Sequence, residues 1–163
     1  MGVFLYFLRH GQTAYSLTGG YCGTPENDPG LTEAGLAMAQ EFADSYAALP
    51  WTAAYVSPLR RAVETAQPLC DRCHLQMQLR SGLREVMYGH WEGMHPSAVD
   101  QAYHDEYVAW LTDPVARDRT LARIEAVARG VVRPGSAARA AEVVIDIAAR
   151  AAKAAPARGR RAA

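Results

Sequence analysis

The sequence predicts an α/β fold, a three-layer sandwich with a mostly parallel central sheet. Two observations support this fold class. Residues 3–8 are apolar at every position, as in a parallel strand buried on both faces. Downstream, short apolar runs alternate with amphipathic helical patterns, which is typical of a sheet covered by helices. At 163 residues, half of them apolar, we expect one domain over residues 1–163.

The elements follow from apolar spacing and from residues that start or stop helices. Thr32 can cap a helix, and Pro50 ends it. A polar, glycine-rich loop over residues 11–30 precedes this helix. The expected elements are strands at 3–8, 53–56 and 75–79, and helices at 32–49, 59–71 and 97–111.

The composition changes after residue 114. Residues 1–114 carry six Arg and thirteen acids, a balance of −7, whereas residues 115–163 carry ten Arg, one Lys and four acids, a balance of +7. Seventeen of those last 49 residues are Ala. We expect an atypical, Ala/Arg-rich helical tail, with one helix around residues 121–127 and another over 136–155. A strand at 143–147 is the alternative.

The composition also limits the partners and the compartment. No apolar run approaches the ~20 residues of a membrane span, and residues 3–8 lack the basic leader of a signal peptide. The basic tail carries no aromatic residue that could stack on bases. We therefore expect a cytoplasmic protein with no membrane and no nucleic-acid partner.

Three cysteines allow two cofactor alternatives. Cys70, Cys73 and His74 match the C-x-x-C-H pattern of c-type haem attachment. A zinc site would need Cys22 or another distant ligand to complete four positions. Both patterns are short, and ordinary unreactive thiols are the preferred interpretation.

The chemistry is concentrated where two predicted strands end. Arg9, His10 and Gly11 follow the first strand, and Ser57-Pro58-Leu59-Arg60-Arg61 follows the second. Both turns belong to the carboxyl edge of a parallel sheet, where ligands bind. Guanidinium groups and a helix N-terminus at this edge could converge on one anion.

These motifs resemble those of the histidine phosphatase superfamily, the phosphoglycerate mutase-like group. The Arg-His-Gly opening matches residues 9–11, and the pattern Ser-Pro-Leu-x-Arg-Ala-x-x-Thr-Ala matches residues 57–66. Glu85 and the run Gly89 to Gly93 match the family's Glu motif, and residues 31–35 match its Leu-Thr-Glu-x-Gly leader. The resemblance covers roughly residues 3–114.

The resemblance implies a role for each matching residue. His10 is expected to be the nucleophile that forms a phosphohistidine. Arg9 and Arg60 are expected to clamp the phosphate oxygens. Glu85 is expected to act as the acid and base, and Glu92 is the alternative residue for that role. Arg61 is expected to be an ordinary cation on the helix surface. Gln12, Thr13 and Gly23 are expected to line the pocket, and neither a metal nor another cofactor is implied.

The chain departs from the family pattern at two places. Ser16 stands where the family has Asn, and no histidine follows His104 to serve as the second catalytic His. His90, His95 and His104 are possible substitutes, although ordinary surface positions are the preferred interpretation. Residues 142–150 resemble the family helix that precedes the missing motif, so we expect a truncated or altered chain. A sheet lacking strands would expose apolar surface and favour homo-oligomers.

Two functions follow from this pattern. The first is hydrolysis of a small phosphorylated metabolite, or phosphoryl transfer as in mutases, through His10. The alternative is a catalytically impaired relative that still binds phosphate. The haem protein described above is a third possibility.

Overall fold

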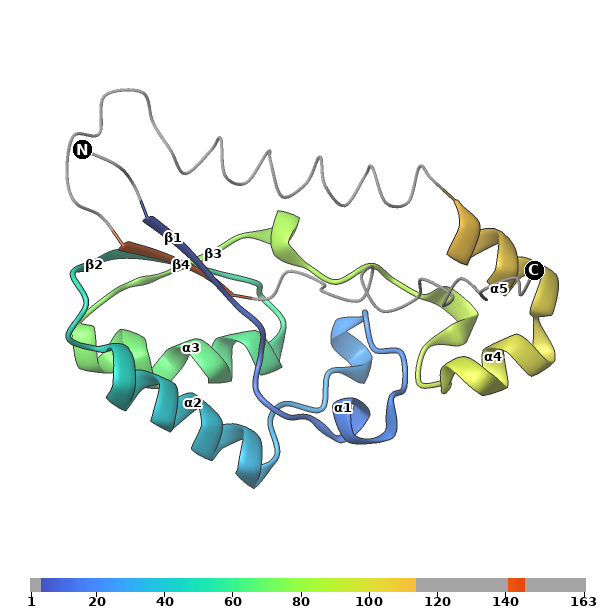
Figure 1. Ribbon diagram of the computed structural model, residues 1–163, viewed down its shortest axis with the longest axis horizontal. Coiled ribbons are helices and arrows are strands. Elements are labelled where there is room, and N and C mark those ends of the chain that lie inside the picture. Colours follow the sequence, from blue (N-terminus) through green and yellow to red (C-terminus); the bar gives the residue numbers. More distant parts are fainter. Residues whose placement is uncertain (1–3, 114–140, 146–163) are drawn as a thin grey trace, which may run out of the picture.

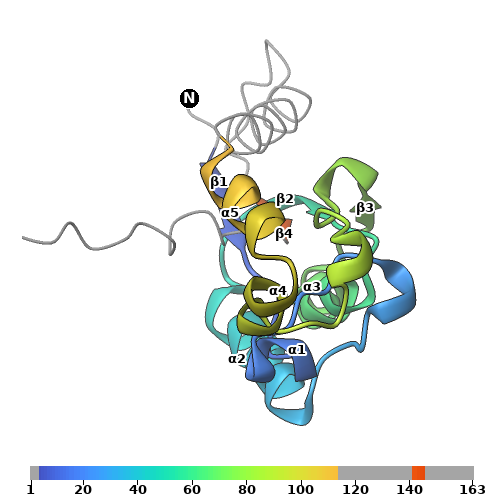
Figure 2. The ribbon, with the colours of Figure 1, turned by 90° about the vertical axis from the view of Figure 1, so that its right-hand side faces the viewer.

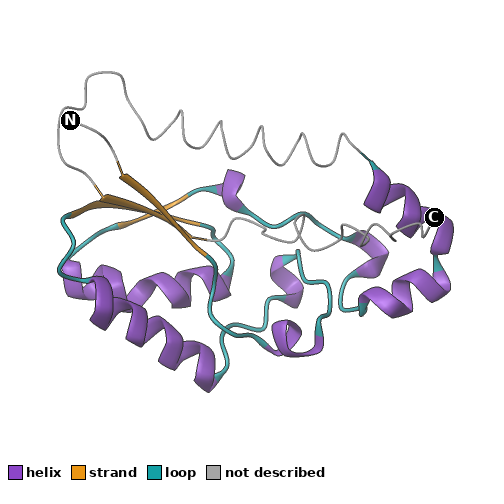
Figure 3. Ribbon diagram, viewed as in Figure 1, coloured by secondary structure: helices purple, strands orange, loops and turns teal. Residues whose placement is uncertain are grey.

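The computed structural model describes residues 4–113 and 141–145 (Figure 1). The elements alternate between strand and helix along most of this length (Figure 3). The strands are β1 (Phe4–Leu8), β2 (Trp51–Val56), β3 (Met77–Leu79) and β4 (Ala141–Ile145), and the helices are α1 (Ala14–Thr18), α2 (Glu33–Tyr46), α3 (Arg60–Cys73), α4 (Pro96–Ala102) and α5 (His104–Thr112). Short 3₁₀ turns lie at Pro25–Asn27, Ser81–Leu83 and Gly89–Trp91.

The four strands form one parallel sheet in the order β1-β4-β2-β3. The last strand in the sequence therefore lies between the first and the second. In register, Phe4 and Trp51 both pair with Ala141, and β2 shifts its register between Trp51 and Ala53. Because all strands run the same way, their carboxyl ends lie together at one edge of the sheet.

Helices α2 and α3 pack side by side on the same face of this sheet, as the two perpendicular views agree (Figures 1 and 2). Apart from Trp51, the core between sheet and helices is built from small and medium side chains, four of them alanines, which lets the helices approach closely. Thr32 caps α2 by accepting a hydrogen bond from the Gly35 amide at 3.1 Å. The buried core residues here are Ala43, Trp51, Ala54, Val56, Ala62, Ala66, Leu69 and Cys70.

A second, aromatic core lies under α4 and α5, beyond the carboxyl end of the strands (Figure 1). Tyr21, from the loop after α1, stacks on Tyr88 with ring centroids 4.4 Å apart. Trp110 of α5 meets Tyr21 edge-on at 6.0 Å. This aromatic cluster consists of Tyr21, Tyr88, Trp91, Tyr103, Tyr107 and Trp110, with Val99 at its buried centre.

The α/β class and the parallel sheet are confirmed, with four differences in detail. Strand β2 begins two residues before the expected 53, and β3 covers only the last part of 75–79. The single helix expected at 97–111 is wrong, because the backbone breaks at Tyr103 (φ −139°, ψ 43°) and separates α4 from α5. The helix expected at 136–155 is also wrong over residues 141–145, which form β4, and the alternative strand at 143–147 is confirmed over 143–145. The family helix expected at 142–150 is therefore not formed over 142–145.

The described residues supply the sheet and the helical layer made by α2 and α3. The helix expected around 121–127, and the remainder of the segment at 136–155, lie outside the described residues. Among residues 4–113 and 141–145, no helix is long and apolar enough to cross a membrane.

Candidate active site

The turn that follows β1 is fixed by close packing against α2 and α3. The Gly11 amide donates a hydrogen bond to the Thr65 hydroxyl of α3 at 2.9 Å. A Cβ at Gly11 would lie 2.6 Å from the Gly35 carbonyl oxygen of α2, and one at Gly35 would overlap the Gln12 carbonyl. Only glycine allows this approach at both positions. The turn therefore sets His10 at the edge of the sheet with little freedom to move.

His10 is held as a neutral imidazole. Its Nδ1 lies 2.7 Å from the Gly11 carbonyl oxygen, so Nδ1 carries the proton and donates. The pKa of His10 is lowered from 6.5 to about 4, mainly by burial and also by the positive charges of Arg61 and Arg9, against the opposing effects of the Gly11 hydrogen bond and of Asp28. At neutral pH the Nε2 lone pair is therefore available.

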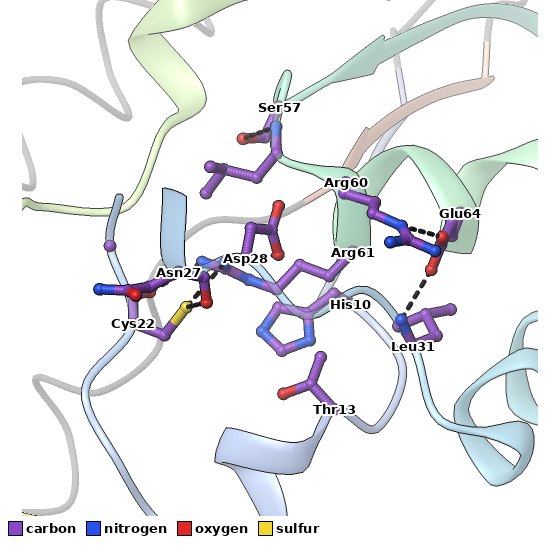
Figure 4. Close-up of polar contacts among 12 residues, drawn as sticks. His10, Thr13, Cys22, Asn27, Asp28, Leu31, Ser57, Arg60, Arg61 and Glu64 are labelled. Atoms are coloured by element: carbon purple, nitrogen blue, oxygen red, sulfur yellow. Dashed lines mark hydrogen bonds and ion pairs between the residues drawn. The ribbon is translucent and has the colours of Figure 1, made fainter. Parts of the chain in front are cut away.

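Arg61 is the buried cation of the site, where the sequence pattern suggested a surface residue. Its side chain is 3% exposed, and its Nη1 forms an ion pair with Oδ1 of Asp28 at 3.2 Å. Nη2 donates to the Cys22 carbonyl oxygen at 3.1 Å. Figure 4 shows the Arg61 side chain running beside His10. The expectation that Arg61 lies on the helix surface is wrong.

The Arg60 side chain points away from His10 and toward Glu64 (Figure 4). Its side chain is 68% exposed and its Nε pairs with Oε1 of Glu64 at 2.6 Å. The second Glu64 oxygen accepts the Leu31 amide at 2.6 Å, so this pair ties α3 to the chain entering α2 (Figure 4). The structure does not bring Arg60 together with His10. Arg61, and not Arg60 as predicted, is the arginine of this helix that lies beside His10 (Figure 4). Adjacent helical residues differ by about 100° in direction, which accounts for the contrast.

The other predicted residues of this turn divide between the surface and the scaffold. Arg9 is exposed at the end of β1, near enough for its charge to act on His10. The Gln12 side-chain oxygen accepts a hydrogen bond from the Thr32 hydroxyl at 2.8 Å, which links the turn to the α2 cap. Thr13 is buried and caps α1 in a reciprocal box with Ser16, at 3.1 and 2.7 Å. Ser16 therefore has a structural role in α1.

Gly23 connects the site to the Glu motif. Its amide donates to both carboxylate oxygens of Glu92, at 3.1 and 3.0 Å, and Oε1 of Glu92 also accepts the Tyr88 amide at 3.0 Å. A Cβ at Gly23 would overlap the Val86 carbonyl oxygen. Gly23 thus allows its loop to contact the segment that contains Val86, and Glu92 joins the two by hydrogen bonds.

Glu85 stands on the segment that borders this junction. It is half-buried, and its Oε1 accepts the Val86 amide at 3.0 Å. Its charge, with that of Glu92, contributes to raising the pKa of Cys22, although burial of the thiol is the main cause. Of the two acids, Glu92 accepts three backbone amide contacts, whereas the role of Glu85 stays a prediction.

The three histidines considered as substitutes for a second catalytic His lie on the surface around α4 and α5. His90 pairs with Glu106 at 3.2 Å, and His104 with Asp100 at 2.7 Å. His95 caps α4 and contacts Ser97 at 2.7 Å. All three are exposed, and each contacts a polar side chain of α4 or α5.

The C-x-x-C-H pattern lies at the end of α3. Cys70 is 2% exposed and belongs to the main core, so a thioether bond to haem is sterically excluded there. His74 is exposed and ends the helix with φ 55°. Within the part of the chain that the structure describes, no three His, Cys, Asp or Glu side chains are grouped so that they could hold a metal ion.

Comparison with known proteins places these features in a family. The model of the histidine phosphatase superfamily (branch 1) matches residues 5–154. Glucosyl-3-phosphoglycerate phosphatase of Mycolicibacterium vanbaalenii is 35% identical over 109 residues, covering 67% of this chain and 48% of that protein. The 2,3-bisphosphoglycerate-dependent phosphoglycerate mutase of Bartonella quintana is 34% identical over 113 residues, covering 66% and 54%. The chain spans about half the length of the curated relatives it matches.

A solved structure shares the fold over more of its length. Bacillus stearothermophilus YhfR superposes with a TM-score of 0.70 at 23% identity, covering 90% of this chain and 74% of that one. The likeness supports the α/β architecture of the described residues.

Proposed function

This chain belongs to the histidine phosphatase superfamily (branch 1), and we propose that it hydrolyses a small phosphomonoester through a phosphohistidine on His10. The observation that carries the proposal is the state of His10. With Nδ1 donating to the Gly11 carbonyl at 2.7 Å and a pKa of about 4, the imidazole is neutral and its Nε2 lone pair can attack phosphorus.

Arg61 supplies the positive charge beside the attacked phosphorus, in place of the predicted Arg60. Phosphoryl transfer spreads negative charge over the equatorial oxygens, and a fixed guanidinium stabilises that charge. Arg9, at the end of β1, contributes a second and more exposed cation. Its charge and that of Arg61 both act on His10.

Glu85 is the proposed acid and base. In the first step Nε2 of His10 bonds to phosphorus, the ester oxygen leaves, and Glu85 gives that oxygen a proton. In the second step Glu85 takes a proton from water, whose oxygen attacks the phosphohistidine and releases phosphate. His10 then returns to its neutral form.

The relatives support a small phosphorylated metabolite as the substrate. Their names include phosphatases for glucosyl-3-phosphoglycerate and a phosphoglycerate mutase. We favour hydrolysis over transfer between metabolites, because a mutase has to shield its phosphohistidine from water. We also propose a cytoplasmic location and assembly into homo-oligomers.

The test is hydrolysis of an aryl phosphate by the 163-residue chain and its His10→Ala variant, with a metal chelator present. We expect turnover by the wild type and none by H10A. If both are inactive while folded, and inorganic phosphate still raises the unfolding temperature, the chain is the phosphate-binding relative instead. If both turn over equally, the His10 mechanism is wrong.

A further inference from the structure

Asp28, which forms a buried ion pair with Arg61 near His10, has no role in the reaction described above. The side chains of Arg61 and Asp28 are 3% and 2% exposed, and they pair at 3.2 Å. Asp28 lies in the loop between α1 and α2, which also provides the Cys22 carbonyl that accepts from Nη2 at 3.1 Å. Two different nitrogens of one guanidinium are thus held by a single loop (Figure 4).

The ion pair between Arg61 and Asp28 is not expected to stabilise the fold. Removing both charges from water costs several kcal/mol for each ion, and a buried pair often does no better than an apolar one. The second oxygen, Oδ2 of Asp28, is buried without a hydrogen-bond partner among the described residues. Such a group adds a further cost to folding, so the carboxylate is better explained by what it does to Arg61.

Direct electrostatics on the nucleophile does not explain Asp28 either. Its negative charge raises the pKa of His10, whereas burial and the charges of Arg61 and Arg9 lower that pKa. A carboxylate beside a phosphate site also repels the substrate. Its benefit to phosphoryl chemistry therefore has to pass through the guanidinium that it contacts.

We propose that Asp28 is a positioning residue: with the Cys22 carbonyl, it fixes the orientation in which Arg61 meets a phosphoryl group at His10. The proposal rests on the proposed function for the identity of that group. Two contacts to different nitrogens determine the guanidinium plane, and the planar fork of Arg requires such alignment to meet phosphate oxygens in a bidentate way. Misplacing a catalytic group by about 1 Å can cost about 100-fold in rate.

The experiment is a double-mutant cycle on the full chain, using orthovanadate as a phosphate mimic and calorimetry to measure its affinity. The variants are Asp28→Asn, Arg61→Ala and the double variant. We expect D28N to weaken vanadate binding about 10-fold or more when Arg61 is present, and less than about 2-fold when Arg61 is absent. Equal weakening in both backgrounds would show that Asp28 does not act through Arg61 and would overturn the proposal.

Two further variants separate positioning from folding. Asp28→Glu keeps a negative charge beside the buried guanidinium but moves the carboxylate by one methylene. We therefore expect this variant to fold, and to bind vanadate more weakly than the wild type does. Wild-type vanadate affinity in either folded Asp28 variant would overturn the proposal. Asp44→Asn removes the same charge from an exposed ion pair with Arg72 on the helices, and it is expected to leave vanadate affinity unchanged.

A ligand-free measurement keeps the two proposals distinct. In NMR spectra, the Arg61 guanidinium protons of the wild type are expected to exchange slowly with water, and those of D28E to exchange at least about 10-fold faster. If the wild type binds no vanadate but shows this difference, the proposed function fails and the positioning holds. Equally slow exchange in D28E and the wild type would overturn the positioning.

Discussion

The two sides of the Gly23 junction are stabilised in different ways. On one side, His10 and Arg61 are fixed by backbone contacts at glycines and by a buried ion pair. On the other, α4 and α5 are fixed by stacked and edge-on aromatic rings. Hydrogen bonds and ion pairs depend steeply on geometry, whereas aromatic packing tolerates several arrangements. The comparison indicates that the side with His10, which we propose to be catalytic, is held by contacts that fix position, whereas the aromatic side is held by burial.

The comparison predicts that small changes on the catalytic side have large effects on activity. The strongest contrast is between two adjacent arginines. Arg61→Ala is expected to lower kcat/KM for an aryl phosphate by about 100- to 1,000-fold, because a fixed charge on the transferring group is lost. Arg60→Ala is expected to change it less than about 3-fold, since Arg60 pairs with Glu64 at the surface. Equal losses in the two variants would contradict the assignment of Arg61.

The junction between the two sides can be broken directly. Gly23→Ala places a Cβ onto the Val86 carbonyl oxygen, and we expect a loss of about 2–3 kcal/mol in the free energy of unfolding measured with urea. The matched control is Gly89→Ala, where a Cβ meets nothing within 4 Å and only the φ of 60° is strained. That variant should lose about 1 kcal/mol. Similar losses would mean that Gly23 is not a point of close contact.

The burial of His10 predicts a particular dependence of stability on pH. Because its pKa is about 4 in the folded chain and 6.5 when exposed, the unfolded chain binds a proton first as pH falls. Stability is therefore lost between about pH 6.5 and 4, and His10 accounts for about 1–3 kcal/mol of that loss. The measurement is urea unfolding at pH 4.5 and 7.5, beside His10→Gln. An equal pH dependence in both proteins would contradict a partly buried, neutral His10.

The smallest effect is expected on the aromatic side. Trp110→Phe keeps an aromatic ring against Tyr21, Trp91 and Tyr107 but removes part of the buried surface. We expect a loss of about 1 kcal/mol in the free energy of unfolding and less than about a 3-fold change in kcat/KM. A much larger loss of activity with normal stability would show that this side also serves the reaction.

The same division explains what could be predicted from the sequence. The Arg-His-Gly turn and helices α2 and α3 follow from local signals, namely an apolar strand, a Thr cap and regular apolar spacing. The choice between Arg60 and Arg61 was also available: the pattern Ser-Pro-Leu-x-Arg places its arginine at 61, and Arg61 shares a helix face with the buried Thr65.

Other features depend on contacts that no local pattern contains. Tyr103 separates α4 from α5 without a Gly or Pro nearby, so nothing in the local sequence marks the break. An Ala-rich neighbourhood favours helix, so the apolar run at 143–147 offered a strand only as the alternative, and the pairing of residues 141–145 with β1 and β2 decides for the strand. Asp28 sits 33 positions before Arg61, and only the folded chain reveals their pairing.

The central claim is that His10 carries the phosphoryl group during turnover, and trapping that intermediate tests it most directly. The chain would be mixed with an aryl phosphate, quenched in alkali within milliseconds, digested and analysed by mass spectrometry. The account predicts a phosphate that is stable in base and labile in acid on the peptide containing His10, and none in His10→Ala. Turnover by the wild type with phosphate on another residue, or with no phosphoenzyme and equal turnover by the variant, would contradict it.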